Sequence, residues 1–417
     1  MGSNDLRERL RRLGLRRGPQ AVQKRRRRSA IEDLIPGELQ TNRLGSFFLH
    51  SESHAAGDAH GVHRLGDLLG YVPTVLARLA RDDRLSSVDP ARIAFIDTET
   101  TGLAGGTGTY VFLVGVGAFD SGSFTIRQFF MRDYHEEPAQ LHALGELLDG
   151  FEAVVSFNGQ QFDMPLLDTR FVMTRQPPRL SGAPHLDLLP TARTFWRHRL
   201  ESCALSSLEA EVLGVQREHQ DVAGWLIPSM YVDYTRTGDA HEMPRIFYHN
   251  AQDILSLVSL AAHQCALLTS PLPPTGDVPG EDLYGLGRFL QDQGEESRAE
   301  AAYALAARAS RLPGVREAAM RDLAFLLKRQ ERRSEALTWW QELAEGAGAV
   351  YACEELAKHY EWRDGDPAQA LAWTERAMAL AEAHRPDPKR SETLAGLEHR
   401  RERLLRKNSG MSRAPEA

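Results

Sequence analysis

Two carboxylates, Asp97 and Glu99, end a short apolar segment of the sequence AFIDTETT at residues 94–101. In a β-strand, alternate side chains point to the same face, so these two acids would lie side by side. Like charges at that distance repel each other unless a cation lies between them. Asp163 in FNGQQFD and Asp253 in HNAQDILSL are two further acids in short, distinctive contexts. Four such carboxylates indicate metal-dependent hydrolysis of phosphodiesters.

Each acid taken alone also has a purely structural interpretation. Asp163 suits the first turn of a helix, where the helix dipole favours a negative charge. Asp253 would suit the third position of a helix that Asn250 caps. His185 and Asp187 share one side of a predicted strand end, which is compatible with a supporting or a structural role. The occurrence of all four acids together favours the chemical interpretation.

The elements around these acids are predicted to form a mixed α/β domain. The first three strands should be antiparallel and the later two parallel, which gives a mixed sheet flanked by helices. By contrast, residues 31–70 contain four histidines without a recurrent ligand pattern, and we expect them to be mostly loop. The expected strands are 92–97, 109–119, 123–131, 152–157 and 185–188, and the expected helices are 138–148, 164–174, 188–199, 205–213 and 243–268.

The C-terminal third is predicted to be helical and repetitive. Ala336-Leu-Thr-Trp339 matches Ala370-Leu-Ala-Trp373 at an offset of 34 residues, and other pairs recur at 33 and 35. A period near 34 with paired helices is typical of tetratricopeptide repeats, and a generic helical bundle is the alternative. The predicted segments are a basic disordered arm (1–30), an extension packing on the next domain (31–90), the α/β domain (91–269), a Pro-rich linker (270–280), the tetratricopeptide-like helices (281–406) and a disordered tail (407–417).

Charge is unevenly distributed along the chain. Residues 1–28 contain eleven Lys and Arg against two acids, a net charge of +9, and since the whole chain carries −7 the remainder carries −16. Such an arm either tethers the protein to phosphate backbones or remains a solvated tail. Three widely spaced cysteines suggest neither a disulfide framework nor a zinc site. No signal segment or apolar run of about 20 residues is evident, so we expect a cytoplasmic protein without a membrane partner.

Five motifs resemble, in order, those of the bacterial YprB-like ribonuclease H-like proteins within the DEDD superfamily of 3′→5′ exonucleases. The likeness extends roughly over residues 31–268 and is strongest from residue 93. One motif, FNGQQFDMP, is also similar to a motif of the proofreading domains of family B DNA polymerases. The five motifs are DTETTGLAGGTGTYVFLVG, FNGQQFDMPLL, HLDLLPTAR, SCALSSLEAEVLGV and HNAQDILSL.

The resemblance implies a ribonuclease H-like fold and two bound Mg²⁺ or Mn²⁺ ions, which suit all-oxygen ligands. In that family pattern Asp97 would bridge both ions. Glu99 and Asp253 would complete the shell of the first ion, and Asp163 would hold the second.

Two residues are candidates for handling the proton, because superfamily members carry either His five residues before the last Asp or Tyr four before it. Here the two are exchanged, with Tyr248 five residues and His249 four residues before Asp253. Residues four apart share a helix face, which favours His249 as the group that orients or deprotonates the water. Tyr248 would then pack or contact substrate, but if Asn250 capped the helix, His249 would lie outside it.

The resemblance also implies substrate contacts near the acids. Leu103 matches an apolar wedge that separates terminal bases, although a buried loop leucine would look the same. Phe162 is expected to pack beneath Asp163, and Asn158 to fix the preceding turn. The predicted substrate-binding residues are therefore Thr100, Leu103, Asn158 and Phe162.

The expected function is 3′→5′ exonucleolysis that releases nucleoside monophosphates from single-stranded DNA or RNA ends. One alternative is a structure-specific endonuclease on the same fold. The other is a non-catalytic adaptor that binds nucleic acid through the α/β domain and a protein through the helical repeats. Retention of all four acids argues against the adaptor. The choice between DNA and RNA depends on contacts to the 2′-hydroxyl, which no residue of the sequence identifies.

Overall fold

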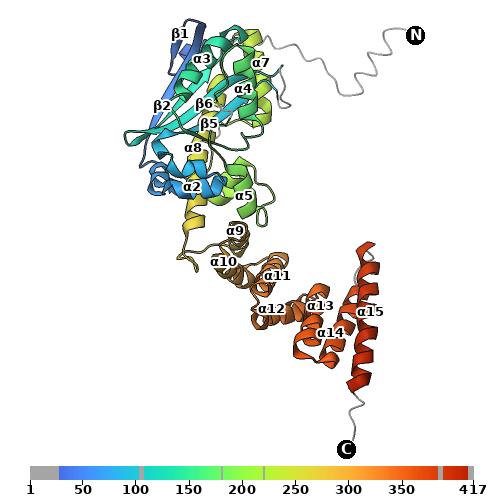
Figure 1. The fold of residues 1–417 in the computed structure, drawn as a ribbon. Coiled ribbons are helices and arrows are strands. Elements are labelled where there is room, and N and C mark those ends of the chain that lie inside the picture. The colour runs from blue at the N-terminus through green and yellow to red at the C-terminus, as the bar shows by residue number, and fades with distance from the viewer. Residues whose placement is uncertain (1–27, 103–107, 180–181, 219–220, 384–387, 412–417) are drawn as a thin grey trace, which may run out of the picture.

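The computed structural model describes residues 28–102, 108–179, 182–218, 221–383 and 388–411. Its N-terminal part contains a seven-stranded sheet in the order β1-β2-β7-β6-β5-β8-β9 and a two-stranded hairpin of β3 and β4 (Figure 1). The basic arm falls almost wholly outside the described residues. The strands are β1 (Glu38–Asn42), β2 (Gly45–Ala55), β3 (Ala59–His60), β4 (His63–Arg64), β5 (Ile93–Thr100), β6 (Val111–Asp120), β7 (Ser123–Phe130), β8 (Ala153–Ser156) and β9 (His185–Asp187).

The central strand β5 alternates between two hydrophobic cores, one on each face of the sheet. Ala94 and Ile96 lie in the core beneath α3 (Glu137–Leu148) and α4 (Asp163–Met173). Ile93 and Phe95 lie in the opposite core, where α8 packs. All four side chains are buried, as expected for a strand covered on both faces. The remaining helices of this domain are α2 (Pro73–Ala80), α5 (Leu188–Trp196), α6 (Leu205–Leu208), which continues as a π-turn over Glu209–Leu213, α7 (Ile227–Thr237) and α8 (Met243–Thr269).

The predicted mixed sheet is confirmed. β5, β6 and β7 pair antiparallel, whereas β5, β8 and β9 pair parallel. The expectation of loop for residues 31–70 is wrong, because β1 and β2 extend the sheet at one edge. β2 pairs antiparallel with β7 over Phe48 to Ala55. Only its Phe47 and Phe48 are buried, and residues 50–54 are all polar, so the apolar alternation of a strand is weak there.

Helix α8 runs across one face of the sheet in close contact with β6. A side chain added at Gly115 of β6 would overlap the Asn250 amide oxygen and the Ile254 methyl group, so glycine is what admits the helix this closely. Among the described residues α8 alone is long and apolar enough to span a membrane, and 78% of its most apolar window is buried inside the protein. That burial is what the core helix of a globular domain shows.

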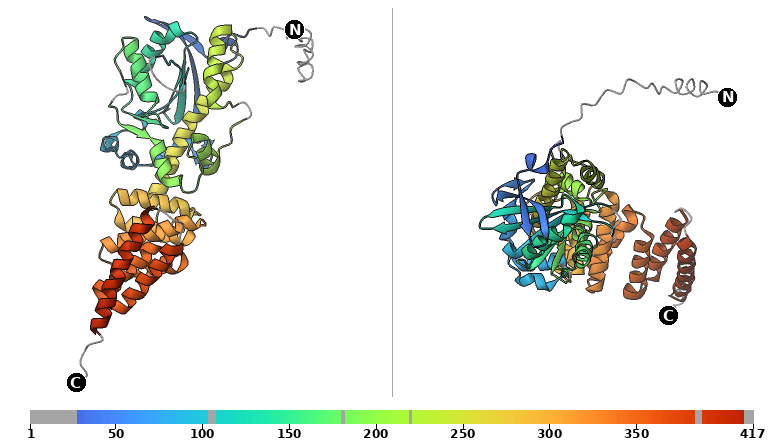
Figure 2. Two further views of the ribbon diagram at one scale, coloured as in Figure 1. Left: turned by 90° about the vertical axis from the view of Figure 1, so that its right-hand side faces the viewer. Right: turned by 90° about the horizontal axis from the view of Figure 1, so that it is seen from above.

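Beyond residue 279 the described chain is helical and extends away from the α/β domain (Figure 2). Three helix pairs stack in sequence, followed by one long basic helix. Between the first and second pairs, the side chain of Gln330 donates to that of Glu296, 34 residues earlier. The helices are α9 (Gly280–Asp292), α10 (Glu296–Ala309), α11 (Pro313–Arg329), α12 (Arg333–Gly346), α13 (Val350–His359), which continues as a π-turn over Tyr360–Asp364, α14 (Pro367–Ala383) and α15 (Pro388–Met411).

The two parts of the chain meet where α5 packs against α9. Arg199 donates to both carboxylate oxygens of the buried Asp282, at 2.7 and 3.1 Å. Arg78 pairs with Glu295 at the same junction. Such a bidentate, largely buried pair fixes orientation more firmly than an exposed one. The helical part is therefore docked on the α/β domain, and not merely tethered to it.

Candidate active site

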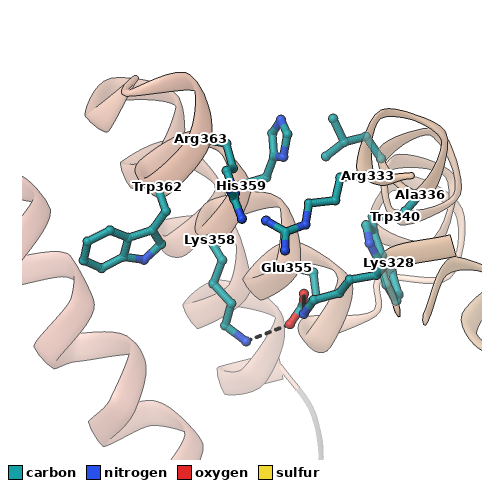
Figure 3. Close-up of a pocket in the computed structure, with 10 residues that line it drawn as sticks. Lys328, Arg333, Ala336, Trp340, Glu355, Lys358, His359, Trp362 and Arg363 are labelled. Atoms are coloured by element: carbon teal, nitrogen blue, oxygen red, sulfur yellow. Dashed lines mark hydrogen bonds and ion pairs between the residues drawn. The ribbon is translucent and has the colours of Figure 1, made fainter. Parts of the chain in front are cut away.

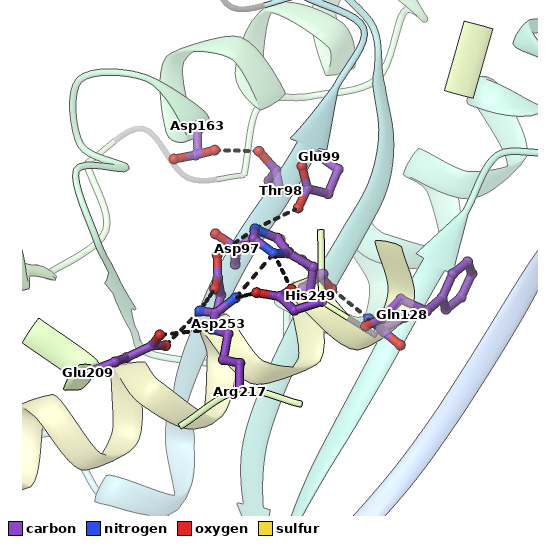
Figure 4. Close-up of polar contacts among 12 residues, drawn as sticks. Asp97, Thr98, Glu99, Gln128, Asp163, Glu209, Arg217, His249 and Asp253 are labelled. Carbon is purple, nitrogen blue, oxygen red and sulfur yellow. Dashed lines mark hydrogen bonds and ion pairs between the residues drawn. The ribbon is translucent and has the colours of Figure 1, made fainter. Parts of the chain in front are cut away.

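β5 carries Asp97 and Glu99 on the face that α8 covers. Asn250 of α8 donates its amide to the Asp97 carboxylate at 2.7 Å and to the Asp97 backbone carbonyl at 3.2 Å. The amide oxygen of Asn250 in turn accepts from the buried Gln128 at 2.8 Å. This chain of hydrogen bonds ties α8 to the end of β5, and it fixes Asp97 in one orientation (Figure 4).

Asp163 approaches the same strand end from the opposite face. Thr98, which points away from Asp97 by the alternation of the strand, donates its hydroxyl to the Asp163 carboxylate. Asp163 is the first residue of α4, so the helix dipole also favours its negative charge. The carboxylates therefore surround the end of β5 from both sides, as Figure 4 shows.

The turn that leads into Asp163 is held by Asp187 of β9. This carboxylate accepts from the backbone amides of Asn158 at 2.7 Å and Gln160 at 3.2 Å, and it also caps α5 through Leu189. His185 of the same strand contacts the Ser156 hydroxyl at 2.8 Å. Asp187 is thus a positioning residue for the Asp163 turn.

His249 and Asp253 lie inside α8, which begins at Met243, so Asn250 is not a helix cap. The His249 Nε2 atom lies 3.7 Å from the Asp253 carboxylate and 4.0 Å from that of Glu99. Tyr248 points elsewhere, since its hydroxyl accepts from the Glu218 backbone amide at 3.0 Å. Of the two residues, only His249 is seen in contact with the carboxylates.

The contacts of Nδ1, the other ring nitrogen of His249, indicate which of the two nitrogens carries the proton. Nδ1 lies 2.8 Å from the Asp221 carboxylate and 3.1 Å from the Arg217 guanidinium. A guanidinium only donates and a carboxylate only accepts, so one Nδ1 cannot satisfy both. The shorter contact fits a proton on Nδ1, and Nε2 is then the basic nitrogen, on the side of Glu99 and Asp253.

Arg217 is the residue of the site that the sequence analysis missed. Its guanidinium donates to both oxygens of Glu209, at 2.6 and 2.8 Å, and to the Asp253 carboxylate. Burial opposes the charge of Arg217, but the acceptors Glu209 and Asp253 outweigh it and hold the pKa of Arg217 above its ordinary value. The Ser256 hydroxyl also donates to the Glu209 carboxylate, at 2.5 Å. Arg217 therefore fixes Asp253 through a charged network behind it.

Burial raises the pKa values of Asp97 and Glu99 well above the ordinary range for carboxyl groups, and the neighbouring acids raise them further. Burial also raises the pKa of Asp163. An adjacent divalent cation would reverse these shifts, because it favours the charged form of each acid. Hard oxygen donors of this type suit Mg²⁺ or Mn²⁺.

No group of three or more His, Cys, Asp or Glu side chains is already gathered around one point in the described part of the chain. The donor chemistry nevertheless fits a divalent ion, since the acids are oxygen ligands and, at Asp97 and Glu99, burial and the neighbouring acids outweigh the favourable charge of Arg217. The residues that would hold it are Asp97, Glu99, Asp163 and Asp253.

The predicted substrate residues have mixed outcomes. Thr100 bonds the Gly102 carbonyl at 2.9 Å, and Asn158 adopts a left-handed backbone conformation, with φ of 63°, in the turn before Asp163. Phe162 was expected to pack beneath Asp163, but its side chain is 55% exposed, so that expectation is wrong. An exposed ring beside a carboxylate cluster is accessible to a ligand. Leu103 lies outside the described residues.

Comparison with known proteins defines the class of this domain. Residues 94–265 match the RNase_H superfamily, a range that contains Asp97, Glu99, Asp163, His249 and Asp253. The fold and this match define a ribonuclease H-like α/β domain, followed by a helical domain.

The chain is similar to the "Uncharacterized protein YprB" of Bacillus subtilis (strain 168), with 29% identity over 293 residues that make up 69% of each protein. Among solved structures, it matches the family B DNA polymerase of the archaeon Pyrobaculum calidifontis at a TM-score of 0.34 and 16% identity. That match covers 49% of this chain and 29% of the polymerase.

Proposed function

We propose that the protein is a metal-dependent 3′→5′ exonuclease acting on single-stranded nucleic acid. The observation that supports this most directly is the group of acids around the end of β5. Buried carboxylates with raised pKa values are costly to keep unless their charge is used. A ribonuclease H-like domain is a suitable host for such a group.

In the proposed reaction, water adds to the phosphorus of the terminal phosphodiester and the bond to the 3′ oxygen breaks. The departing 3′ oxygen takes a proton from solvent and becomes the new 3′ hydroxyl of the shortened strand. Asp97, Glu99, Asp163 and Asp253 would hold the divalent ions, which when bound would neutralise the charge that develops on the phosphate. His249 takes the proton of the water at Nε2, and Asp221 stabilises the imidazolium through Nδ1. Arg217 keeps Asp253 in place but touches no reacting atom.

The decisive experiment is hydrolysis of end-labelled single strands of DNA and of RNA with Mg²⁺, Mn²⁺ or Ca²⁺. The exonuclease proposal expects mononucleotides released progressively from the 3′ end, with blockage by a 3′ phosphate. Internal cuts would support the endonuclease in its place. If the protein binds the strands but cleaves them with none of the three metals, the adaptor would be supported.

We also propose that the three helix pairs are tetratricopeptide-like repeats and that they bind a protein partner. We further propose that the protein is cytoplasmic. The contact between Gln330 and Glu296, at a spacing of 34, supports the repeat period. Expression of residues 277–411 alone would test this. A cooperative, fully helical unit is expected, since each repeat buries its apolar face mainly against its neighbours.

A further inference from the structure

A basic pocket lies in the helical domain, away from the carboxylates. It has a volume of about 270 Å³ and lies between the end of α11, α12 and the end of α13 (Figure 3). Its wall contains the cations Lys328, Arg333, Lys358 and Arg363 and two aromatic side chains, Trp340 and Trp362. Cationic and aromatic groups of this kind converge in ligand sites more often than on ordinary surfaces.

The positive charge of the pocket is only partly compensated. Glu355 is the one acid in the wall, and it accepts from Lys358 at 2.8 Å and from Lys328. Arg333 also pairs through its Nη2 atom with Glu331, outside the wall, at 2.9 Å. Arg363 forms no ion pair with any described residue, and the buried Nε of Arg333 has no hydrogen-bond partner there. The wall therefore retains the unpaired charge of Arg363 and the unused Nε donor of Arg333, both of which an anion would satisfy.

Trp362 marks the rim of this pocket and is 61% exposed. On its other side lies α15, which places Lys407 at 4.4 Å and Arg403 at 5.4 Å from the ring centroid. The buried Glu361 holds both cations and Arg400 in position. Three cations share this single acid, so the positive surface continues from the pocket past Trp362 onto α15.

We propose that this surface binds the phosphates and a base of single-stranded nucleic acid, and thus holds the strand at a second point outside the active site. An acidic peptide would use the cations, but it carries no ring that could stack on the exposed side chain of Trp362. A nucleobase stacks on such a ring while neighbouring phosphates pair with Lys and Arg. The inference rests on the proposed function for the identity of the ligand.

The test uses the full chain in EDTA, which separates binding from hydrolysis, and a fluorescein-labelled single strand of about 20 nucleotides. The variant Trp362→Ala/Arg363→Ala should weaken binding about tenfold. It should also lower the slope of log affinity against log salt by about 0.7, the value for one cation on single strands. The matched control is Leu312→Ala/Arg308→Ala, which removes an exposed apolar side chain and a cation of the same domain outside the pocket wall.

Rescue separates recognition from damage to the fold. Trp362→Phe/Arg363→Lys keeps a ring and a charge, so it should recover most of the affinity at an unchanged melting temperature. Equal binding by wild type and the alanine variant would overturn the inference. So would a decaglutamate peptide that binds to wild type more tightly than the oligonucleotide does.

Failure of the inference and failure of the proposed function can be distinguished. If the alanine variant loses binding while wild type hydrolyses no strand with Mn²⁺, the exonuclease proposal fails, but the inference that this surface binds nucleic acid is supported. If wild type hydrolyses strands and the alanine variant binds them normally, the exonuclease stands and this surface does not bind the substrate.

Discussion

Asp97 is only partly exposed and faces other acids, while the one hydrogen bond that its carboxylate accepts from the described side chains comes from the Asn250 amide. Its raised pKa means that its neutral form favours folding, and this contribution is lost as the pH rises through the folded-state pKa. Asp97→Asn should therefore abolish hydrolysis and raise the melting temperature of the metal-free protein by a few degrees.

Both effects can be measured: the melting temperatures of wild type and Asp97→Asn in EDTA between pH 5 and 8, and their rates in the hydrolysis assay. The difference in melting temperature between variant and wild type should grow with pH, because only wild type ionises at this position. A variant that retains more than a tenth of the wild-type rate would remove Asp97 from the catalytic group.

Arg217 is a second residue for which the structure predicts the direction of a mutational effect, namely a loss of stability. Arg217→Met would leave Glu209 and Asp253 without their partner, and breaking a buried ion pair costs about 3–5 kcal/mol. Arg217→Lys keeps the charge but not the two-pronged contact with Glu209, and should lose less. Urea unfolding measures both, with Arg236→Met, at an exposed pair, as a control that should be near neutral. A stable Arg217→Met would show that the acids are satisfied in another way.

His249 and Tyr248 are adjacent but face different partners, so their substitutions should differ sharply. His249→Ala should reduce the turnover rate about 10²–10⁴-fold, the usual contribution of a general base, with substrate affinity near normal. Tyr248→Phe should be close to neutral, since it removes one hydrogen bond to the Glu218 amide. Single-turnover rates with Mn²⁺ decide the matter. A crippled Tyr248→Phe with an active His249→Ala would reverse the two roles.

At the scale of the elements, the central strands and α8 could be predicted from the sequence, but the strands before them could not. α8 was expected over 243–268 and spans 243–269, because Pro244 suits its first turn and apolar residues recur at helical spacing. β2 was missed because the outer half of that strand is polar. Arg217 was missed because Asp253, the acid of the site that it contacts, is 36 residues away in the sequence. It is nevertheless the only Lys or Arg between residues 209 and 221, which was an available signal.

His60, a titratable residue of β3, connects the hairpin of β3 and β4 to α8 through hydrogen bonds. His60 contacts the Ser256 hydroxyl at 2.8 Å, and its carbonyl accepts from Ser259. Burial and the nearby charge of Arg217 lower the pKa of His60 to about 4. A lowered histidine pKa favours the folded state above about pH 6.5, and this contribution is lost as the pH falls toward 4.

At pH 5, the protonation of His60 is expected to lower the free energy of unfolding by about 2 kcal/mol. This loss should be smaller in His60→Gln, whose side chain does not titrate. Urea unfolding of both proteins at pH 7 and pH 5 measures the difference, with His135→Gln, at a 78% exposed side chain, as the control. Equal acid sensitivity in wild type and His60→Gln would show that His60 is not the group responsible.

At the scale of the whole molecule, one glycine sets how closely the two domains dock. A side chain at Gly285 of α9 would overlap the carbonyl oxygens of Thr194 and Phe195 in α5. Gly285→Ala should therefore separate the domains, so that the single melting transition splits in two and proteolysis near residues 270–279 accelerates. Gly346→Ala meets no atom within 4 Å and should be neutral or slightly stabilising. A single unchanged transition in Gly285→Ala would show that the junction tolerates a wider spacing.

The position of Asp253 on α8 also has a consequence for biosynthesis. Asp97 and Glu99 leave the ribosome with β5, more than 150 residues before Asp253, and the face of the sheet that they occupy stays uncovered until α8 is made. Asn250, which orients Asp97, arrives on the same helix. A nascent or prematurely terminated chain therefore contains the strands of the site but not the helix that completes it. If the domain degrades nucleic acid, that capacity appears only once the domain is whole, and unfinished chains cannot attack the message that encodes them.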